Sequence, residues 1–196
     1  TGIRRQRQMC IRDRINGLRS HINGPNNCIC ITHKENKETV DDCEMFKTGH
    51  PVPNEAGALA SKQVITALKK TDKNDQVLFL VSGGGSALMP APVDGVTLED
   101  KIALNEVLLS NGLNINEMNH IRQQVSKLKG GGLLHYADPT PVTSYILSDV
   151  IGNDLRVVAS GPTVSPLGTT ESALEILAEN DLLNLIPANI KKLSLI

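Results

Sequence analysis

The feature that most constrains the fold is an amphipathic helix, followed at once by an apolar strand and a glycine-rich loop. Apolar residues recur at helical spacing over residues 55–70, and the run Val77–Val81 is apolar throughout. Such a run is typical of a strand buried on both faces of a parallel sheet. The pattern therefore predicts half of a right-handed βαβ unit.

The rest of the chain alternates between strand and helix patterns. We expect strands over residues 27–32, 43–47 and 141–147, and helices over residues 97–110, 116–129, 171–180 and onward from Pro187. Asn54 and Thr97 stand where they can cap the helices that follow them. The alternation predicts an α/β fold, with a layered, mostly parallel sheet and flanking helices, Rossmann-like and incomplete as a domain.

Composition argues against several classes of protein. The net charge of -1 gives no general attraction to nucleic acid or anionic membranes. Two Tyr, two Phe and no Trp are too few for the stacking platforms that hold single-stranded nucleic acid. No apolar run approaches the roughly 20 residues that span a bilayer. We expect a cytoplasmic protein without nucleic-acid or membrane partners, whose cysteines (Cys10, Cys28, Cys30 and Cys43) are free thiols.

The first 20 residues differ from the rest, because they hold six arginines against one acid. A signal peptide would need an apolar core after its basic start, and none follows. A basic arm or a transit peptide is conceivable, but residues 5–14 resemble translated sequencing adaptor. We therefore expect residues 1–23 to be a non-native or disordered basic segment, and residues 24–196 to form the α/β domain.

The loop Ser82–Ser86 directly follows the apolar strand. Ligands of open α/β sheets bind beyond the carboxyl ends of the strands, and glycines let backbone N–H groups turn towards an anion. A P-loop would need Lys after the last glycine, and the nucleophile elbow and dinucleotide fingerprint both fail at Leu88. The prediction is a less common phosphate cradle, with a flexible turn as the alternative, formed by Ser82, Gly83, Gly84, Gly85 and Ser86.

A second candidate cluster lies in the expected helix 116–129. Asn119, Arg122, Ser126 and Lys129 are spaced three, four and three residues apart, which puts them on one helical face. Two cations, an amide and a hydroxyl suit a carboxylate or a phosphate. The alternative is a solvated polar face.

Weaker candidates stand in turns. Asp149 and Asp154 follow the strand 141–147, where carboxylates can hold Mg²⁺ beside phosphates or merely shape a turn. His50, Ser160 and Thr163 lie in turns rich in glycine and proline, which either line a cleft or serve the turn alone.

Six segments, in order and spacing, resemble the class II glycerate 2-kinases, whose C-terminal part is called the MOFRL domain. Some members of that family are named hydroxypyruvate reductases. The resemblance covers residues 24–190 and rests on residues 49–54, 81–88, 117–122, 126–131, 147–154 and 159–163.

The resemblance implies transfer of phosphate from ATP, with Mg²⁺, to the 2-hydroxyl of D-glycerate in a cleft between two domains. It implies that Ser82–Ser86 hold the nucleotide phosphates and that Arg122 and Lys129 are catalytic. Asp149 or Asp154 would help to place the metal. The remaining candidates would bind substrate, namely His50, Asn119, Ser126, Ser160 and Thr163.

The chain also departs from the family pattern. Family members usually have Asp at position 54, His at 124 and Asp at 153, where Asn54, Gln124 and Asn153 stand here. A Gly-Lys-Ala motif expected upstream of residue 24 and the MOFRL domain are missing. We therefore expect a fragment with little or no kinase activity alone. An NAD(P)-dependent hydroxypyruvate reductase, a non-catalytic phosphometabolite-binding module and a homo-oligomer remain open.

Overall fold

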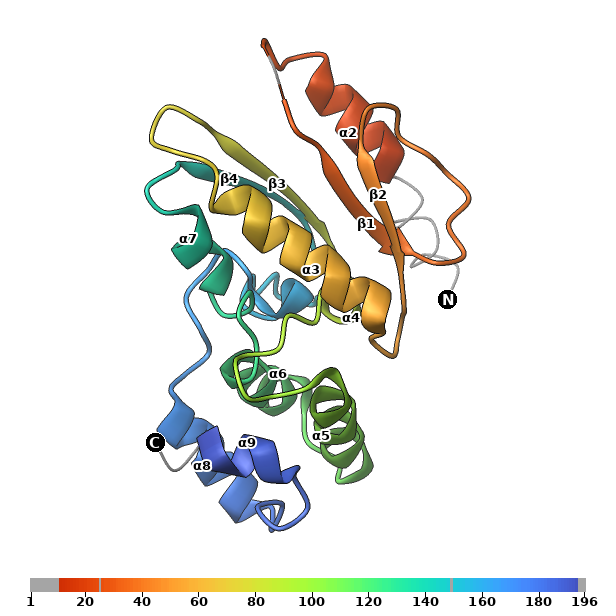
Figure 1. The fold of residues 1–196 in the computed structure, drawn as a ribbon. Coiled ribbons are helices and arrows are strands. Elements are labelled where there is room, and N and C mark those ends of the chain that lie inside the picture. The colour runs from red at the N-terminus through yellow and green to blue at the C-terminus, as the bar shows by residue number, and fades with distance from the viewer. Residues whose placement is uncertain (1–10, 25, 149, 194–196) are drawn as a thin grey trace.

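The computed structural model describes residues 11–24, 26–148 and 150–193, and it combines parallel strands with flanking helices (Figure 1). The α/β class is therefore confirmed. In chain order the elements are α2 (Ile11–Arg19), β1 (Ile29–His33), β2 (Glu44–Thr48), α3 (Glu55–Leu68), β3 (Val77–Ser82), α4 (Gly85–Leu88), α5 (Leu98–Ser110), α6 (Ile115–Gln124), α7 (Gly132–Ala137), β4 (Val142–Leu147), the 3-10 turn η1 (Val158–Ser160), α8 (Thr170–Glu179) and α9 (Ala188–Leu193).

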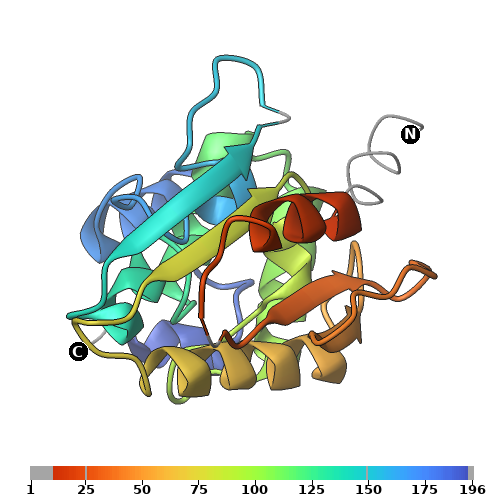
Figure 2. The same cartoon turned by 90° about the horizontal axis from the view of Figure 1, so that it is seen from above.

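The described strands form two separate parallel pairs rather than one sheet. β1 pairs with β2, and β3 pairs with β4 so that Ser82 lies opposite Leu147. α3 lies along one face of the strands (Figure 2), where its side chains pack against β3 and β4. In β3 only Val81 is fully buried, so the expectation of a strand buried on both faces is wrong. The reason is that β3 has one neighbouring strand among the described residues.

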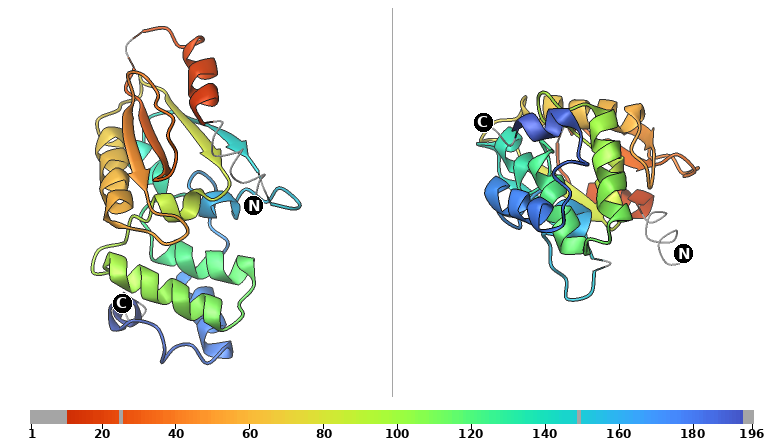
Figure 3. Two further views of the ribbon diagram at one scale, coloured as in Figure 1. Left: turned by 90° about the vertical axis from the view of Figure 1, so that its right-hand side faces the viewer. Right: turned by 90° about the horizontal axis from the view of Figure 1, so that it is seen from below.

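Below the strands lies a layer of helices, α5, α6, α8 and α9 (Figure 3). Their buried side chains form the largest apolar cluster, which includes Leu104, Leu108, Ile121 and Leu177. A second cluster joins α3, α7 and the β3–β4 pair around Leu128. The segments between these two layers carry the candidate site.

The expected helix 116–129 ends early, at Gln124. After it, the chain runs beside residues 90–93 instead. The Lys127 N–H donates to the Ala91 carbonyl (2.8 Å), and Ser126 forms an antiparallel bridge with Pro92. Ser126 and Lys129 therefore do not share a helical face with Asn119 and Arg122. Val125 and Leu128 do continue the helical spacing of apolar residues. The helix nevertheless ends at Gln124, because the backbone after it forms hydrogen bonds with residues 90–93 instead.

Residues 11–19 form helix α2, whereas we expected residues 1–23 to be disordered or non-native. Ile15 is buried against the first strand pair, and the Arg14 guanidinium donates to the carbonyls of Val81 (3.1 Å) and Tyr145 (2.8 Å). The disorder expected for this segment is therefore wrong for residues 11–19, while residues 1–10 lie outside the described residues. A non-native origin of the segment stays a prediction.

The cysteines also differ from expectation. Cys28 and Cys43 are joined by a disulfide, with their Cα atoms 4.6 Å apart. Cys30 is free and buried, and this burial raises its thiol pKa to about 11. The prediction of free thiols is thus wrong for the pair, and Cys10 lies outside the described residues. Within the described ranges, no helix is long and apolar enough to cross a membrane.

The start of α3 gives a first test of the local structure. The Asn54 side-chain oxygen accepts hydrogen bonds from the N–H groups of Gly57 (3.1 Å) and Gly49 (2.9 Å). Asn54→Ala removes both, so we expect it to lower the free energy of unfolding by about 1–2 kcal/mol in urea titrations. Thr66→Ala, on an exposed turn of α3, is the matched control and should change it far less. Equal stability of the two variants would contradict the capping role.

Candidate anion-binding site

The glycine-rich loop ends β3 and turns into the short helix α4. Gly84 has a φ of 84°, a left-handed conformation that favours glycine, and α4 begins at the next residue. Among the described residues, none of the turn, loop and cap hydrogen bonds between backbone groups takes its N–H from residues 83–86. Within the described residues, these backbone bonds leave the amides of the loop available to an acceptor such as an anion.

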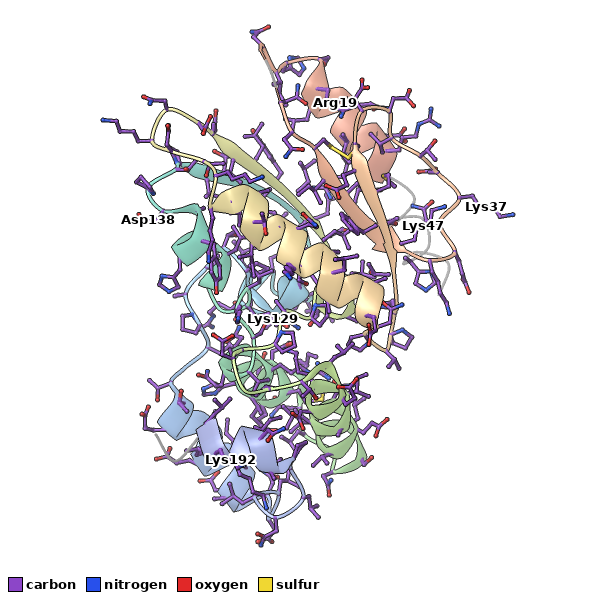
Figure 4. All side chains as sticks on the ribbon, in the orientation of Figure 1. Arg19, Lys37, Lys47, Lys129, Asp138 and Lys192 are labelled. Carbon is purple, nitrogen blue, oxygen red and sulfur yellow. A yellow bond between two sulfur atoms is a disulfide. The ribbon has the colours of Figure 1, made fainter. Side chains whose placement is uncertain are left out.

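Lys129 reaches this loop from the segment after α6. Its side chain is 7% exposed, and Nζ donates to the Ser86 carbonyl oxygen (3.0 Å) and to Ser86 Oγ. Burial, together with the nearby charges of Lys101 and Arg122, holds the Lys129 pKa well below its ordinary value. Figure 4 shows Lys129 between the strand layer and the helical layer. The structure thus joins two of the predicted site residues, Lys129 and Ser86.

A chain of hydroxyl groups extends from Ser86 into the interior. Ser160 Oγ donates to Asn119 Oδ1 (2.8 Å) and lies 3.0 Å from Ser86 Oγ. Because the Ser160 hydrogen is used on Asn119, Ser86 is the donor to Ser160. The order of donation is therefore Lys129 to Ser86 to Ser160 to Asn119. Four residues predicted for three different roles, Lys129, Ser86, Ser160 and Asn119, form one hydrogen-bonded network.

The backbone of Ser160 is held in an unusual conformation. Its φ is +63°, and that of Ala159 before it is +51°, in the region that non-glycine residues rarely adopt. The Ser160 carbonyl accepts from the Gly130 N–H (3.0 Å) and from Gln123 Nε2 (3.1 Å), which hold it in place. Strained backbone of this kind is concentrated at functional sites.

Arg122 and Lys101 complete a cluster of cations around this network. The half-buried Arg122 guanidinium donates to Asn105 Oδ1. Lys101, which sequence reasoning missed, is 8% exposed, and its Nζ donates to the Val125 carbonyl (2.9 Å). Burial, followed by the charge of Arg122, lowers the Lys101 pKa to about 7. The sequence offers one indication that Lys101 is unusual. It is a basic residue near the start of a helix, where the helix dipole disfavours a positive charge.

Among the described residues, no ion pair places a carboxylate beside these basic groups. None of the ion pairs within the described ranges includes Lys101, Arg122 or Lys129. Buried charges are normally paired, so two buried lysines and a half-buried arginine outside these ion pairs favour an anionic ligand. Chemically, the arrangement suits a phosphate or a carboxylate.

Three further residues were predicted to bind substrate, namely His50, Ser126 and Thr163, and each contacts a neighbouring segment of the chain. Ser126 Oγ donates to the Pro90 carbonyl (3.2 Å), a contact that fixes the segment after α6. Thr163 Oγ1 accepts from Ser144 Oγ (2.9 Å) on β4. His50 follows β2, and its carbonyl lies 3.2 Å from His33 Nε2. For His50, Ser126 and Thr163, substrate binding stays a prediction.

The predicted metal ligands are Asp149 and Asp154. Asp149 lies outside the described residues. Asp154 pairs with Arg156 (2.7 Å), whose hydrogen bonds hold the pKa of that carboxyl below its ordinary value. In the described part of the chain, no three His, Cys, Asp or Glu side chains gather where they could hold a metal.

The glycine-rich loop beside a buried lysine, on an α/β frame, forms a candidate anion-binding site. The sequence profile of one family, described as a domain of unknown function (DUF4147), matches residues 10–194. The chain belongs to this family.

Named relatives connect the family with glycerate. The chain is 41% identical over 138 residues to a D-glycerate 2-kinase of Thermotoga maritima, which covers 70% of this chain and 33% of that protein. An Agrobacterium vitis protein named “Putative hydroxypyruvate reductase” is 42% identical to this chain over 134 residues. That match covers 68% of this chain and 35% of that protein. The resemblance to glycerate kinases is therefore confirmed.

Solved structures agree. A crystal structure of glycerate kinase from Thermotoga maritima superposes with a TM-score of 0.80 at 35% identity, covering 86% of this chain and 41% of that one. The chain thus spans about a third of the length of the curated relatives it matches.

Proposed function

We propose that this chain is the phosphate-binding part of an ATP-dependent glycerate 2-kinase. The observation that carries the proposal is the contact between the buried Lys129 amine and Ser86 of the glycine-rich loop, whose amides are open. Kinship with proteins named glycerate kinases supports it.

In this proposal the loop amides and Lys129 hold the phosphates of ATP, while Arg122 faces the transferring phosphate or the glycerate carboxylate. Phosphoryl transfer depends on positioning and charge neutralisation, and buried cations and fixed N–H donors supply both. The network of Ser86, Ser160 and Asn119 keeps Lys129 in place. The phosphate acceptor is the 2-hydroxyl of D-glycerate.

The proposed kinase would use Mg²⁺ beside the nucleotide phosphates. To bind Mg²⁺, Asp154 would have to give up its ion pair with Arg156. A metal-binding role for Asp149 stays a prediction. Mg²⁺ keeps several waters and often needs only one or two protein carboxylates beside the nucleotide phosphates. We also propose a cytoplasmic location, for which the Cys28–Cys43 disulfide would be unusual.

Two other functions are distinguishable. A hydroxypyruvate reductase is supported by the names of some relatives, yet the loop lacks a complete dinucleotide fingerprint. A non-catalytic phosphometabolite-binding module would use the same cradle without turnover. We expect the 196-residue chain alone to have little or no kinase activity. Robust phosphorylation of glycerate by it would contradict this.

Calorimetric titration of the chain with Mg·ATP tests the proposed site. We expect binding that Gly84→Asp weakens at least about 100-fold, because a carboxylate would occupy the cradle and repel phosphate. Gly95→Asp is a matched control, since Gly95 also has a left-handed backbone (φ +83°) and its added Cβ meets nothing within 4 Å. Equal loss in both variants, or NADH binding in place of Mg·ATP, would argue against the kinase.

A further inference from the structure

Gln123, in the last turn of α6, lies where several segments of the candidate site meet. It is 5% exposed, and sequence reasoning did not single it out. Its amide nitrogen Nε2 donates to the carbonyl oxygens of Arg156 and Ser160, each at 3.1 Å. Its Oε1 accepts from the Leu167 N–H (2.9 Å). Both donor hydrogens of the amide are thus used, and one buried side chain holds the loop of residues 156–167 on α6.

The same side chain packs beside the segment that carries Lys129. An added Cβ on Gly130 would lie 3.3 Å from both Cβ and Cδ of Gln123, so the amide faces the backbone directly after Lys129. The Gly130 N–H donates to the Ser160 carbonyl (3.0 Å), the same oxygen that accepts from Gln123. Gln123 therefore contacts both of the segments that the network of hydrogen bonds joins.

The conformation of Ser160 needs such support. A non-glycine residue with a φ of +63° keeps this backbone only where its surroundings hold it. With the carbonyl fixed, the Ser160 hydroxyl meets Asn119 on one side and Ser86 on the other. Ser86 in turn contacts the Lys129 amine. Without the Gln123 amide, the turn could relax and withdraw the Ser160 hydroxyl from Ser86.

We propose that Gln123 is a positioning residue of the anion site, which fixes the turn at Ser160 so that Ser86 and Lys129 are already oriented when a phosphate group arrives. Gln123 makes no bond to the ligand, because its amide is committed to three groups of the chain. Donors that are oriented in advance raise affinity, since little ordering is needed on binding. This inference rests on the proposed phosphate site and adds to it a residue outside the predicted set.

Calorimetric titration of the whole chain with inorganic pyrophosphate tests the role of Gln123. Gln123→Met keeps the length of the side chain and removes its amide. We expect the affinity to fall roughly tenfold, which corresponds to the loss of about one hydrogen bond. All variants are compared at a temperature at which they are fully folded.

Gln124→Met is the matched control. Gln124 is the next residue of α6, and its amide also makes hydrogen bonds, to the Gly168 carbonyl (3.4 Å) and from Thr170 Oγ1 (3.1 Å). These bonds lead towards α8 and not towards the glycine-rich loop. Both variants lose the hydrogen bonds of a glutamine, but only Gln123→Met should lose affinity for pyrophosphate.

Two further measurements show whether Gln123 acts through Ser160. In a Ser160→Ala chain the hydroxyl is already gone, so adding Gln123→Met should change the affinity by less than about twofold. Hydrogen exchange of the Gly130 N–H should be faster in Gln123→Met than in Gln124→Met, because its acceptor, the Ser160 carbonyl, is no longer fixed. Fully additive losses of affinity, or unchanged exchange at Gly130, would contradict the inference.

The outcomes separate this inference from the proposed site. If Gln123→Met binds pyrophosphate as tightly as the unchanged chain, or if Gln124→Met weakens binding equally, the inference is overturned and the proposed site stands. If the unchanged chain does not bind pyrophosphate, both are overturned. Should Gln123→Met fail to fold, Gln123→Asn takes its place with the same expectations, because it keeps an amide on a side chain too short to reach the same carbonyls.

Discussion

Gly132→Ala is expected to lower the free energy of unfolding by about 3–4 kcal/mol, or to prevent folding. An added Cβ would press directly on the Lys127 carbonyl oxygen and lie 2.9 Å from the carbonyl carbon. These are backbone atoms, held by the Lys127 N–H bond to Ala91, so neither can turn aside. The segment that presents Lys129 would have to move with them.

Urea titration followed by circular dichroism measures this effect. Gly17→Ala is the matched control, because Gly17 lies inside helix α2 and an added Cβ meets nothing within 4 Å. It should raise the free energy of unfolding by up to about 1 kcal/mol, as alanine does in helix interiors. A Gly132→Ala chain as stable as the unchanged one would mean that this tight packing is wrong.

The second large effect concerns pH. The pKa of Lys101 is about 7 in the folded chain and has its ordinary value of 10.5 when unfolded, because folding buries the amine beside Arg122. Between these two values the unfolded chain holds a proton that the folded chain lacks, so stability rises with pH. The cost of Lys101 is fully present below pH 7, and it is relieved as pH rises towards 10.5. Over that window the contribution is on the order of 5 kcal/mol.

Lys101→Met isolates this contribution. The variant should be more stable than the unchanged chain at pH 6, and the difference should disappear as the pH approaches 11. The free energy of unfolding of the variant should also change less with pH. It should still rise with pH, because the lowered pKa of Lys129 contributes in the same direction. Thermal unfolding measured in steps from pH 6 to pH 11 gives both curves. A constant difference across this range would show that Lys101 is charged in the folded chain.

Local patterns predicted the elements that depend on neighbours in sequence. The α3 helix, its Asn54 cap and the strand β3 follow from apolar spacing and capping chemistry. The glycine-rich loop was likewise placed correctly at the end of β3. The end of α6 was not, because Val125 continues a helical period that the bonds to residues 90–93 interrupt.

Contacts between distant segments could not be predicted from one sequence. Lys101 is an ordinary helical lysine in the sequence and becomes a buried amine only when α5 packs on the segment after α6. The Cys28–Cys43 bond depends on the register of β1 and β2, where Ile29 lies opposite Glu44 and the two cysteines precede them. The grouping of Ser86, Asn119, Lys129 and Ser160 likewise comes from the fold.

The helix at Ile11–Arg19 has a practical consequence for anyone trimming the chain for expression. Composition suggests discarding everything before residue 24 as foreign. That cut would remove the Arg14 guanidinium, which ties the carbonyls of Val81 and Tyr145 on adjacent strands. Val81 stands one residue before the loop Ser82–Ser86. A shortened version would thus lose these hydrogen bonds next to the candidate phosphate site, so weak binding by it would reflect the choice of boundary rather than the chemistry of the site.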